Sequence, residues 1–592
     1  MRFVLAIVSF VLAALMIGWG IGQRTILAGP ESATSSVRTE AAPLTVVDGE
    51  AVEQLGIELD ALSPSRSMTV SGEGELLVAY GRTVDVLAWV GDTDHNLVTA
   101  DLESGELVSE LVTGAESEAP DPRGSDLWFD EVDGVDAVEL TSGVRSDMSV
   151  LLATDGTAPA PDAISVQWPI DDSTPYAVPL IVAGSVMLVL GLALYIWALV
   201  HLRRGQGPRR KTAKQPKGPK PPRRPKPGVL GAGRPPGPQL ESPRGRRATR
   251  KRIALLPAGI AVAALAGCTG TPSLDVDASP SPSASESAGP AVEPPVVTQA
   301  QAERILAQVA EVGAAADEAR DADAASARFD GAALDERRGY YALLAAEAEE
   351  PAPPVIPASV VEVTLPQATE AWPRTVFAVL RDEADAEASQ VAVVLTQNSP
   401  RENYKVQYAV AFAPGAQFPD VAPASIGAAR LSPDDQLLAV PPSQLGAAYG
   451  DVLINGDSSG SAGLFSEEAD GLRTQIGQQN RQDTRDALGE NGTFDTRIEA
   501  GTGETIALAT NDAGAIVAVS LKDVYEVKPV DSGEINLGET TAAVLDKEST
   551  TTGVRSTYGL QLLFAVPPST AADQTVRVLG YSNGFLEASE LE

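Results

Sequence analysis

The chain has 592 residues, too many for one domain, and 44% of them are hydrophobic, which permits folded cores although only 5% are aromatic. Its formal net charge of −36 is unevenly distributed. Residues 203–252 contain 18 Lys or Arg and one acid, so the rest of the chain carries a net charge of −53. An acidic body repels nucleic acid, and one cysteine allows neither an intramolecular disulfide nor a clustered cysteine zinc site. We therefore expect no nucleic-acid partner, no metal site and no cofactor.

The first segment, residues 1–22, reads MRFVLAIVSFVLAALMIGWGIG. Its run of about 20 apolar residues, interrupted by Ser9, is long enough to cross a hydrocarbon core roughly 30 Å thick. A cleaved signal peptide is the alternative, but no clear small-x-small cleavage site closes the run. We predict a transmembrane helix or signal anchor.

Residues 29–175 are predicted to form an extracytoplasmic all-β domain, a small sandwich or open barrel. Short runs rich in β-branched residues are separated by Gly and Asp turn formers, and no run shows convincing helical periodicity. The expected strands are 67–70, 76–80, 84–90, 97–102, 107–112, 138–140, 149–153 and 164–168.

The second apolar segment, residues 176–200, contains 25 residues without a charge. Tyr176 and Trp197 lie near its two ends, where amphipathic rings favour the membrane interface. We predict a transmembrane helix here. The basic, Pro-rich segment 203–252 that follows has too little apolar surface to fold, and positive residues beside a membrane segment stay in the cytoplasm. We predict a disordered cytoplasmic linker that is attracted to membrane lipids.

The third apolar segment, residues 253–268, resembles the start of a bacterial lipoprotein. A basic head, RRATRKR, precedes an apolar run that is short for a spanning helix but normal for a signal peptide. The run ends in Leu265, Ala266, Gly267 and Cys268, which is similar to a lipobox. We predict that Cys268 is lipidated. The alternative is that these four residues occur by chance in an Ala- and Gly-rich chain and that the segment is a third anchor.

These segments predict one path through the membrane. The N-terminus is inside, residues 29–175 are outside, the basic linker is inside, and everything after Cys268 is outside. Residues 269–297, rich in Ser and Pro, are expected to be a flexible tether. We predict a multi-pass protein of the cell membrane with extracytoplasmic domains.

The region after the tether is predicted to be α+β. Thr298 and Gln301 fit a capping box, and Ile305, Leu306 and Val309 continue a helical stripe. The expected helices are 298–312, 331–346 and 466–488, and the expected strands are 360–365, 375–381, 391–397, 405–413, 496–499, 505–510, 515–521, 560–566 and 575–580.

The order of helix and then strands occurs twice in this region, in residues 298–450 and 451–592. In element order it resembles two repeats of a cystatin-like or NTF2-like domain. One larger α+β domain is the alternative. If the resemblance holds, it implies a sheet with a concave face, and an apolar pocket lined by Phe377, Tyr408, Phe412 and Phe564 is then expected.

Two motifs have the residue types of active sites. Residues 456–460, GDSSG, follow a strand-like run, DVLIN, and match the pattern of a serine nucleophile on a strand–turn–helix elbow, but no histidine follows His201 to act as its base. Asp92, Asp94 and His95 are reminiscent of a metal-binding element of glycosyltransferases, although Asp beside Gly91 is typical of a turn. We expect no catalytic residue at either motif.

The whole chain resembles uncharacterised actinobacterial cell-envelope proteins that combine a membrane-anchored ectodomain with a lipoprotein-like domain. The residues that carry this resemblance are 265–268. The resemblance implies lipid attachment at Cys268, and it implies no activity. We predict a non-catalytic, membrane-anchored envelope protein, not an enzyme, whose acidic domains bind or scaffold a cell-wall or envelope protein partner. The alternative function is an enzyme of envelope polymers, a glycosyltransferase or hydrolase.

Overall fold

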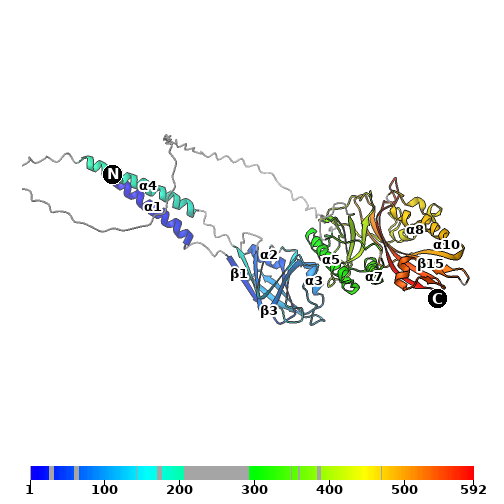
Figure 1. Cartoon of the computed structure of the whole chain (residues 1–592). Coiled ribbons are helices and arrows are strands. Elements are labelled where there is room, and N and C mark those ends of the chain that lie inside the picture. Colours follow the sequence, from blue (N-terminus) through cyan, green and yellow to red (C-terminus); the bar gives the residue numbers. More distant parts are fainter. Residues whose placement is uncertain are drawn as a thin grey trace, which may run out of the picture. The chain divides into compact units, whose positions relative to one another are not determined.

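The computed structural model describes residues 2–25, 32–58, 66–142, 145–169, 176–205, 293–348, 350–357, 361–382, 389–468, 470–531 and 533–592. The described residues fall into two units (Figure 1): residues 2–17 and 182–205 belong to one, and the described residues within 18–181 and 293–592 belong to the other.

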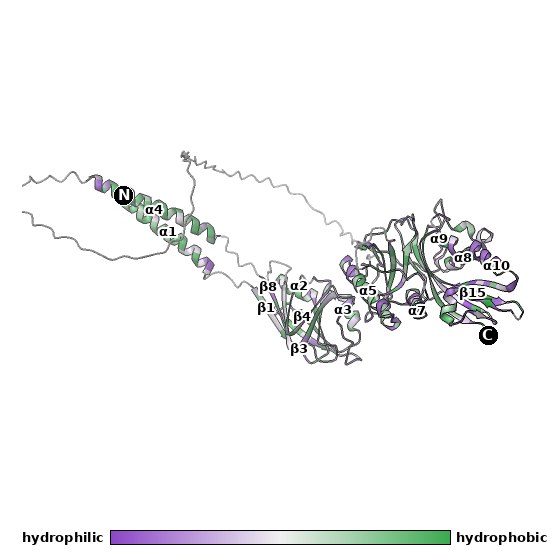
Figure 2. Ribbon diagram, viewed as in Figure 1, coloured by the Kyte–Doolittle hydropathy of each residue, from purple (hydrophilic) through white to green (hydrophobic). Residues whose placement is uncertain are grey.

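Two long apolar helices, α1 (Arg2–Thr25) and α4 (Ala177–Gly205), pack against each other. Figure 2 shows both as hydrophobic along most of their length. Small residues allow the close approach: Ser9 Oγ donates to the Met187 carbonyl at 2.8 Å, and a Cβ on Gly184 would lie 2.7 Å from Ile17. Residues 3–25 and 177–203 are long and apolar enough to span a membrane. The third predicted segment, 253–268, lies outside the described residues.

The N-terminal soluble region, residues 32–169, is called the β domain below. Its sheet has the order β1-β8-β3-β7-β2-β4-β5, with β6 paired to β3. The last strand of this order, β5, lies against the first, β1, and Leu107 N of β5 donates to Ser35 Oγ of β1 at 3.0 Å. The strands are β1 (Ser32–Arg38), β2 (Leu44–Asp48), β3 (Arg66–Arg82), β4 (His95–Asp101), β5 (Glu106–Val112), β6 (Asp130–Ser142), β7 (Met148–Ala153) and β8 (Ala163–Pro169).

This region is β-rich as predicted, but it also contains two helices, α2 (Gly49–Glu58) and α3 (Thr83–Val90). The prediction of a strand over 84–90 was therefore wrong. Val86, Trp89 and Val90 are buried at positions i, i+3 and i+4, which is helical spacing that the β-branched composition concealed. The predicted strands 67–70 and 76–80 are one long strand, β3, in which the intervening glycines form a bulge instead of a turn.

The C-terminal domain, residues 293–592, is α+β as predicted. Its nine-stranded sheet has the order β13-β15-β18-β19-β12-β11-β10-β9, with β14 paired to β15. The strands are β9 (Val361–Pro366), β10 (Arg374–Leu380), β11 (Val391–Gln397), β12 (Lys405–Phe412), β13 (Gly492–Ala500), β14 (Ile506–Ala509), β15 (Ala515–Pro529), β18 (Val554–Val566) and β19 (Arg577–Glu590), and a separate pair is β16 (Ile535–Asn536) and β17 (Ser549–Thr550).

Residues 428–431 close this sheet into a ring. Ala428 exchanges hydrogen bonds with the end of β9, and Ala429 and Leu431 exchange them with β14, so the two edges of the sheet are joined. A cluster of apolar side chains from both halves fills one face, including Phe377, Leu563 and Leu579. Strands from 298–450 and from 451–592 therefore belong to one sheet.

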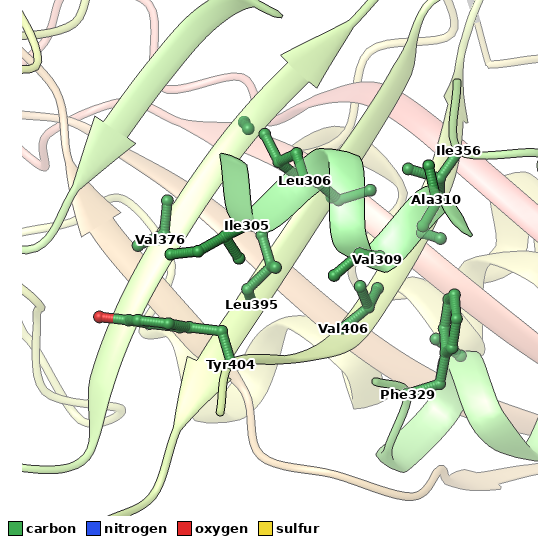
Figure 3. Close-up of a cluster of buried hydrophobic side chains, with 14 of the residues drawn as sticks. Ile305, Leu306, Val309, Ala310, Phe329, Ile356, Val376, Leu395, Tyr404 and Val406 are labelled. Atoms are coloured by element: carbon green, nitrogen blue, oxygen red, sulfur yellow. The ribbon is translucent and has the colours of Figure 1, made fainter. Parts of the chain in front are cut away.

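Helices cover the other face of the sheet. Figure 3 shows Ile305, Leu306 and Val309 of α5 (Gln299–Ala319) directed at side chains of β10, β11 and β12. The predicted capping box of α5 is confirmed, with Thr298 and Gln301 bonded reciprocally. The other helices are α6 (Ala322–Ala325), α7 (Gly331–Ala345), α8 (Pro442–Asn455), α9 (Gly471–Ile476), α10 (Gln478–Leu488) and α11 (Glu539–Leu545), with short 3₁₀ turns η1 (Gly456–Ser458), η2 (Ala462–Leu464) and η3 (Gly489–Asn491).

Helix α8 packs against the second half of the sheet (Figure 1). The sequence DVLIN at its end was interpreted as strand-like, which was wrong. Leu445, Tyr449 and Val452 are buried on one face together with Leu453, and a proline begins the helix, where its missing N–H costs nothing. Residues 510–514 form the hairpin connection between β14 and β15.

Candidate functional site

The GDSSG motif follows a helix, not the strand that a nucleophile elbow requires. Ser458 is exposed at the end of η1, and the Ser459 hydroxyl donates to Asp451 of α8. This hydrogen bond lowers the pKa of Asp451 and thereby favours its charged form. The pairing stabilises the turn.

Asp92, Asp94 and His95 lie in the turn between α3 and β4. Asp94 Oδ1 accepts a hydrogen bond from Gly114 N at 2.7 Å, and His95 Nδ1 lies 2.8 Å from the Thr93 carbonyl. Asp92 is exposed. Among the described residues, no group of three or more His, Cys, Asp or Glu side chains is placed to hold a metal ion. The motif acts locally as a turn.

Three of the four aromatic residues expected to line one pocket are on the same face of the sheet. Phe377, Tyr408 and Phe412 share a cluster, in which Phe377 stacks on Phe418 at 5.7 Å. Phe564 belongs to the opposite face, beneath α8. Leu265, Ala266, Gly267 and Cys268 lie outside the described residues, so lipidation at Cys268 stays a prediction.

The most developed polar site of the described residues joins the β domain to the C-terminal domain. We call it the junction. On the β domain it comprises Arg82, Asp85, Trp89, Val90, Thr93, Glu116 and residues 124–129, and on the C-terminal domain it comprises residues 294–304, Arg328, residues 370–374 and residues 401–404.

A buried carboxylate lies at one end of the junction. Asp126 is 1% exposed, and its two oxygens accept hydrogen bonds from Arg328 at 2.5 and 3.1 Å. The same carboxylate accepts from Tyr404 N at 2.7 Å, and Asn403 bonds both Asp126 N and the Gly124 carbonyl at 3.0 Å. A bidentate pair with further hydrogen bonds is the geometry in which a buried charge is tolerated.

A second buried carboxylate, Asp85, is held by arginines from both domains. Arg82 Nε donates to it at 2.7 Å, and Arg374 Nη2 lies 2.7 Å from its other oxygen, an ion-pair distance at an angle unfavourable for a hydrogen bond. Arg82 also donates to the carbonyls of Pro295 and Val296. The Arg374 guanidinium lies 3.6 Å from the centre of the Trp372 ring, a cation–π contact.

Arg401 binds the C-terminal end of α3. It donates to the carbonyls of Trp89 and Val90 at 2.8 Å, to Thr93 Oγ1 at 2.7 Å and to Glu116 at 2.8 Å. The last carbonyls of a helix have no partner within the helix and carry partial negative charge, so a cation is favoured there. The pKa of Glu116 is lowered by its hydrogen bond to Arg401.

The first turn of α5 contacts the β domain as well. Gln301 Nε2 donates to the Leu127 carbonyl at 3.2 Å, and Arg304 donates to the carbonyls of Trp128 and Phe129. Trp372 packs against the apolar cluster of the β domain that contains Trp89 and Trp128. The junction therefore combines polar contacts with an apolar contact made by Trp372.

Burial also acts on a tyrosine of the junction. Tyr404 is fully buried, and its hydroxyl has no hydrogen-bond partner among the described residues. Loss of water raises the pKa of Tyr404 far above its ordinary value, so the side chain stays neutral.

The sequence predictions assigned no residue of the junction to a functional site. Arg401, Asn403 and Tyr404 lie in an ordinary polar turn, SPRENY, between β11 and β12. Their partners are about 280 to 310 residues away in the chain, beyond the reach of any periodicity or spacing argument.

A family model described as "Domain of unknown function (DUF8094)" matches residues 293–590, half of the chain. This range covers both halves of the ring-closed sheet and the C-terminal side of the junction. No curated protein and no solved structure matches the chain.

Proposed function

The chain belongs to the family of the domain of unknown function DUF8094, and from this premise we propose that it is a non-catalytic, membrane-anchored protein of the cell envelope. It presents the β domain and the C-terminal domain together on the outer side of the membrane, as an acidic scaffold for a cell-wall polymer or an envelope protein. Helices α1 and α4 are its anchors, and lipid on Cys268 is the third attachment.

The observation that carries the proposal is the junction. Arg328, Arg374 and Arg401 fix the two domains to each other through buried or half-buried hydrogen bonds and ion pairs. Packed charges of this kind define one relative orientation, as a scaffold requires. The apolar length of α1 and α4 supports the membrane location.

We also propose that the C-terminal domain consists of two related halves, each similar in element order to cystatin-like or NTF2-like domains. In each half, helices precede antiparallel strands. The last strand of the first half, β12, pairs with the last strand of the second, β19, which is the arrangement expected for two halves related by a pseudo-two-fold axis.

The anchoring is tested with a different epitope tag at each terminus, in chains with and without Cys268→Ala. Intact cells are treated with a protease that does not cross the membrane. We expect digestion of the tag after Glu592 and protection of the tag before Met1. Protection of both tags would contradict the proposal. Two fragments in the wild type that become one band in Cys268→Ala would support cleavage and lipidation at the predicted lipobox.

The scaffold role is tested by binding of the purified full chain, in membrane nanodiscs, to isolated cell-wall material and to envelope extract. We expect saturable binding that weakens as salt is raised, because an acidic surface binds through charge. Retention no greater than that of empty nanodiscs would contradict it. Ser458 and Asp92 lie on exposed turns, and no described feature favours the alternative of an envelope-polymer enzyme.

A further inference from the structure

Among the described residues, every hydrogen bond that joins the chain before Cys268 to the chain after it lies at the junction. The described residues make at least fifteen there: four by Arg401, two each by Arg82, Gln301, Arg304 and Arg328, two by Asn403 and one by Tyr404 N. A stable interface between separate proteins has on the order of 10 direct hydrogen bonds. The junction has the polar content of such an interface.

We propose that the junction is a binding surface that is sufficient by itself, and that it keeps the C-terminal domain on the β domain when the chain is cut before Cys268. The inference rests on the proposed function, since that cut belongs to lipobox processing. The partner of the C-terminal domain is then the β domain of the first fragment, and the two products of one reading frame form a non-covalent complex.

The chemistry of the junction matches that of strong interfaces. Trp and Arg are the residues that dominate binding energy most often, and Trp372, Arg328 and Arg401 are the anchors here. The charges are paired across the junction: Arg328 with Asp126, Arg374 with Asp85, and Arg401 with Glu116. In the separated domains Asp126 would lose Arg328 and Glu116 would lose Arg401, while Asp85 would keep Arg82, so the complex is favoured and its orientation is selected.

The junction also constrains the path of the chain. Two domains that contact each other lie on the same side of a membrane, so the chain between β8 and α5 crosses an even number of times. If α4 crosses once, docking of the two domains favours the predicted topology, in which the segment 253–268 returns the chain to the outer side, whatever the fate of α1.

After such a cut, the junction would help to hold the second fragment at the membrane. The described part of the second fragment, from residue 293 onward, contains no helix long and apolar enough to span a membrane. The fragment would then be held by two attachments, the lipid on Cys268 and the junction. A second attachment acts at high effective concentration and slows loss from the surface.

The test uses the full chain in detergent, with a tag at each terminus and a specific protease site inserted between residues 269 and 292. After cutting, the N-terminal tag is captured and the C-terminal tag is followed through washing. We expect the wild-type fragments to stay together. In the double variant Arg401→Glu, Asn403→Ala we expect loss about tenfold faster or more, because six hydrogen bonds are removed.

Arg497→Glu is the matched control, because Arg497 pairs with Glu499 and Glu526 within the C-terminal domain. It should be retained like the wild type. If the uncut double variant elutes abnormally in gel filtration, Arg304→Ala takes its place. Wild-type fragments that separate as fast as those of the variant would overturn the inference. Because the assay is done in detergent with an added protease, it reports on the junction even if the chain is neither lipidated nor exported.

Discussion

Asp126 is 1% exposed and depends on Arg328 for its charge compensation. Arg328→Ala leaves a buried carboxylate without its counter-ion. Removal of one partner from such a pair costs about 3–5 kcal/mol. We therefore expect the free energy of unfolding of the soluble domains to fall by about that amount, measured by denaturant titration of the full chain in detergent.

Arg497→Ala is the control for this prediction, because Arg497 is exposed and its more buried partner Glu526 keeps Arg555 and Lys528, so a loss of roughly 0–1 kcal/mol is expected. The double variant Arg328→Met, Asp126→Leu should recover part of the lost stability, because replacing both partners of a buried ion pair with apolar residues costs less than removing only one partner. An Arg328→Ala chain no less stable than the Arg497→Ala chain would contradict the prediction.

Glu336 of α7 is 4% exposed and accepts hydrogen bonds from Ser582 and Gln561. Burial raises its pKa above the ordinary value of 4.5, although the two hydrogen bonds and Arg337 act in the opposite direction. Between the ordinary and the raised pKa, the folded chain holds a proton that the unfolded chain has released. The contribution of protonated Glu336 to the free energy of unfolding is therefore fully present below pH 4.5 and is lost as pH rises through the raised pKa.

The variant Glu336→Gln should lack this dependence. Its amide oxygen can accept from Gln561 and its NH2 group can donate to the Ser582 hydroxyl, but it cannot ionise, so we expect its free energy of unfolding to fall less than that of the wild type between about pH 4.5 and pH 7. The exposed Glu303→Gln serves as the control and should keep the wild-type slope. Equal slopes in all three chains would show that Glu336 does not titrate in this range.

At the scale of elements, the N-terminus of α5 combines a capping box with a contact to the β domain. Thr298 Oγ1 accepts from Gln301 N at 3.2 Å, and Gln301 also reaches the Leu127 carbonyl. Thr298→Ala removes the cap and loosens Gln301. We therefore expect the free energy of unfolding, measured by denaturant titration, to fall by about 1 kcal/mol. The neighbouring exposed Gln299→Ala should change stability by less than about 0.5 kcal/mol. A Thr298→Ala effect within that control range would refute the role of the cap.

The elements that the sequence predicted well carry their own local signal. The strand 391–397 is buried at every position and was predicted with its observed bounds, and α5 has both a cap and an apolar stripe. Helices α3 and α8 were missed because short runs such as DVLIN contain β-branched residues, while the stripe that makes them helical extends beyond the run. Tertiary packing decided these elements, and local propensity did not.

At the scale of the whole molecule, no local pattern predicts the ring-closed sheet or the junction. The pairing of β12 with β19 joins residues 411–412 to 580–581, and Arg401 meets α3 more than 300 residues earlier. Such contacts leave no periodic trace in the chain. The two long apolar helices, α1 and α4, are in contrast predictable, because apolar length alone identifies them.

We propose that the β domain and the C-terminal domain are docked through the junction on the outer side of the membrane. Crosslinking in intact cells tests it most directly. Glu116→Cys and Arg401→Cys are combined in a chain with a protease site between residues 269 and 292, because the native side chains at these positions lie 2.8 Å apart. The cells are treated with a short bis-maleimide that does not cross the membrane, and the chain is then cut.

The two chains with only one of these substitutions, called the single-cysteine chains, also keep the native Cys268 and control for its reaction. Each should fall into two fragments. We predict that the double-cysteine chain keeps its full length after cutting, because the crosslink replaces the severed tether. If the double-cysteine chain falls into the same two fragments as the single-cysteine chains, the domains are not docked on the outer side, and the account is contradicted.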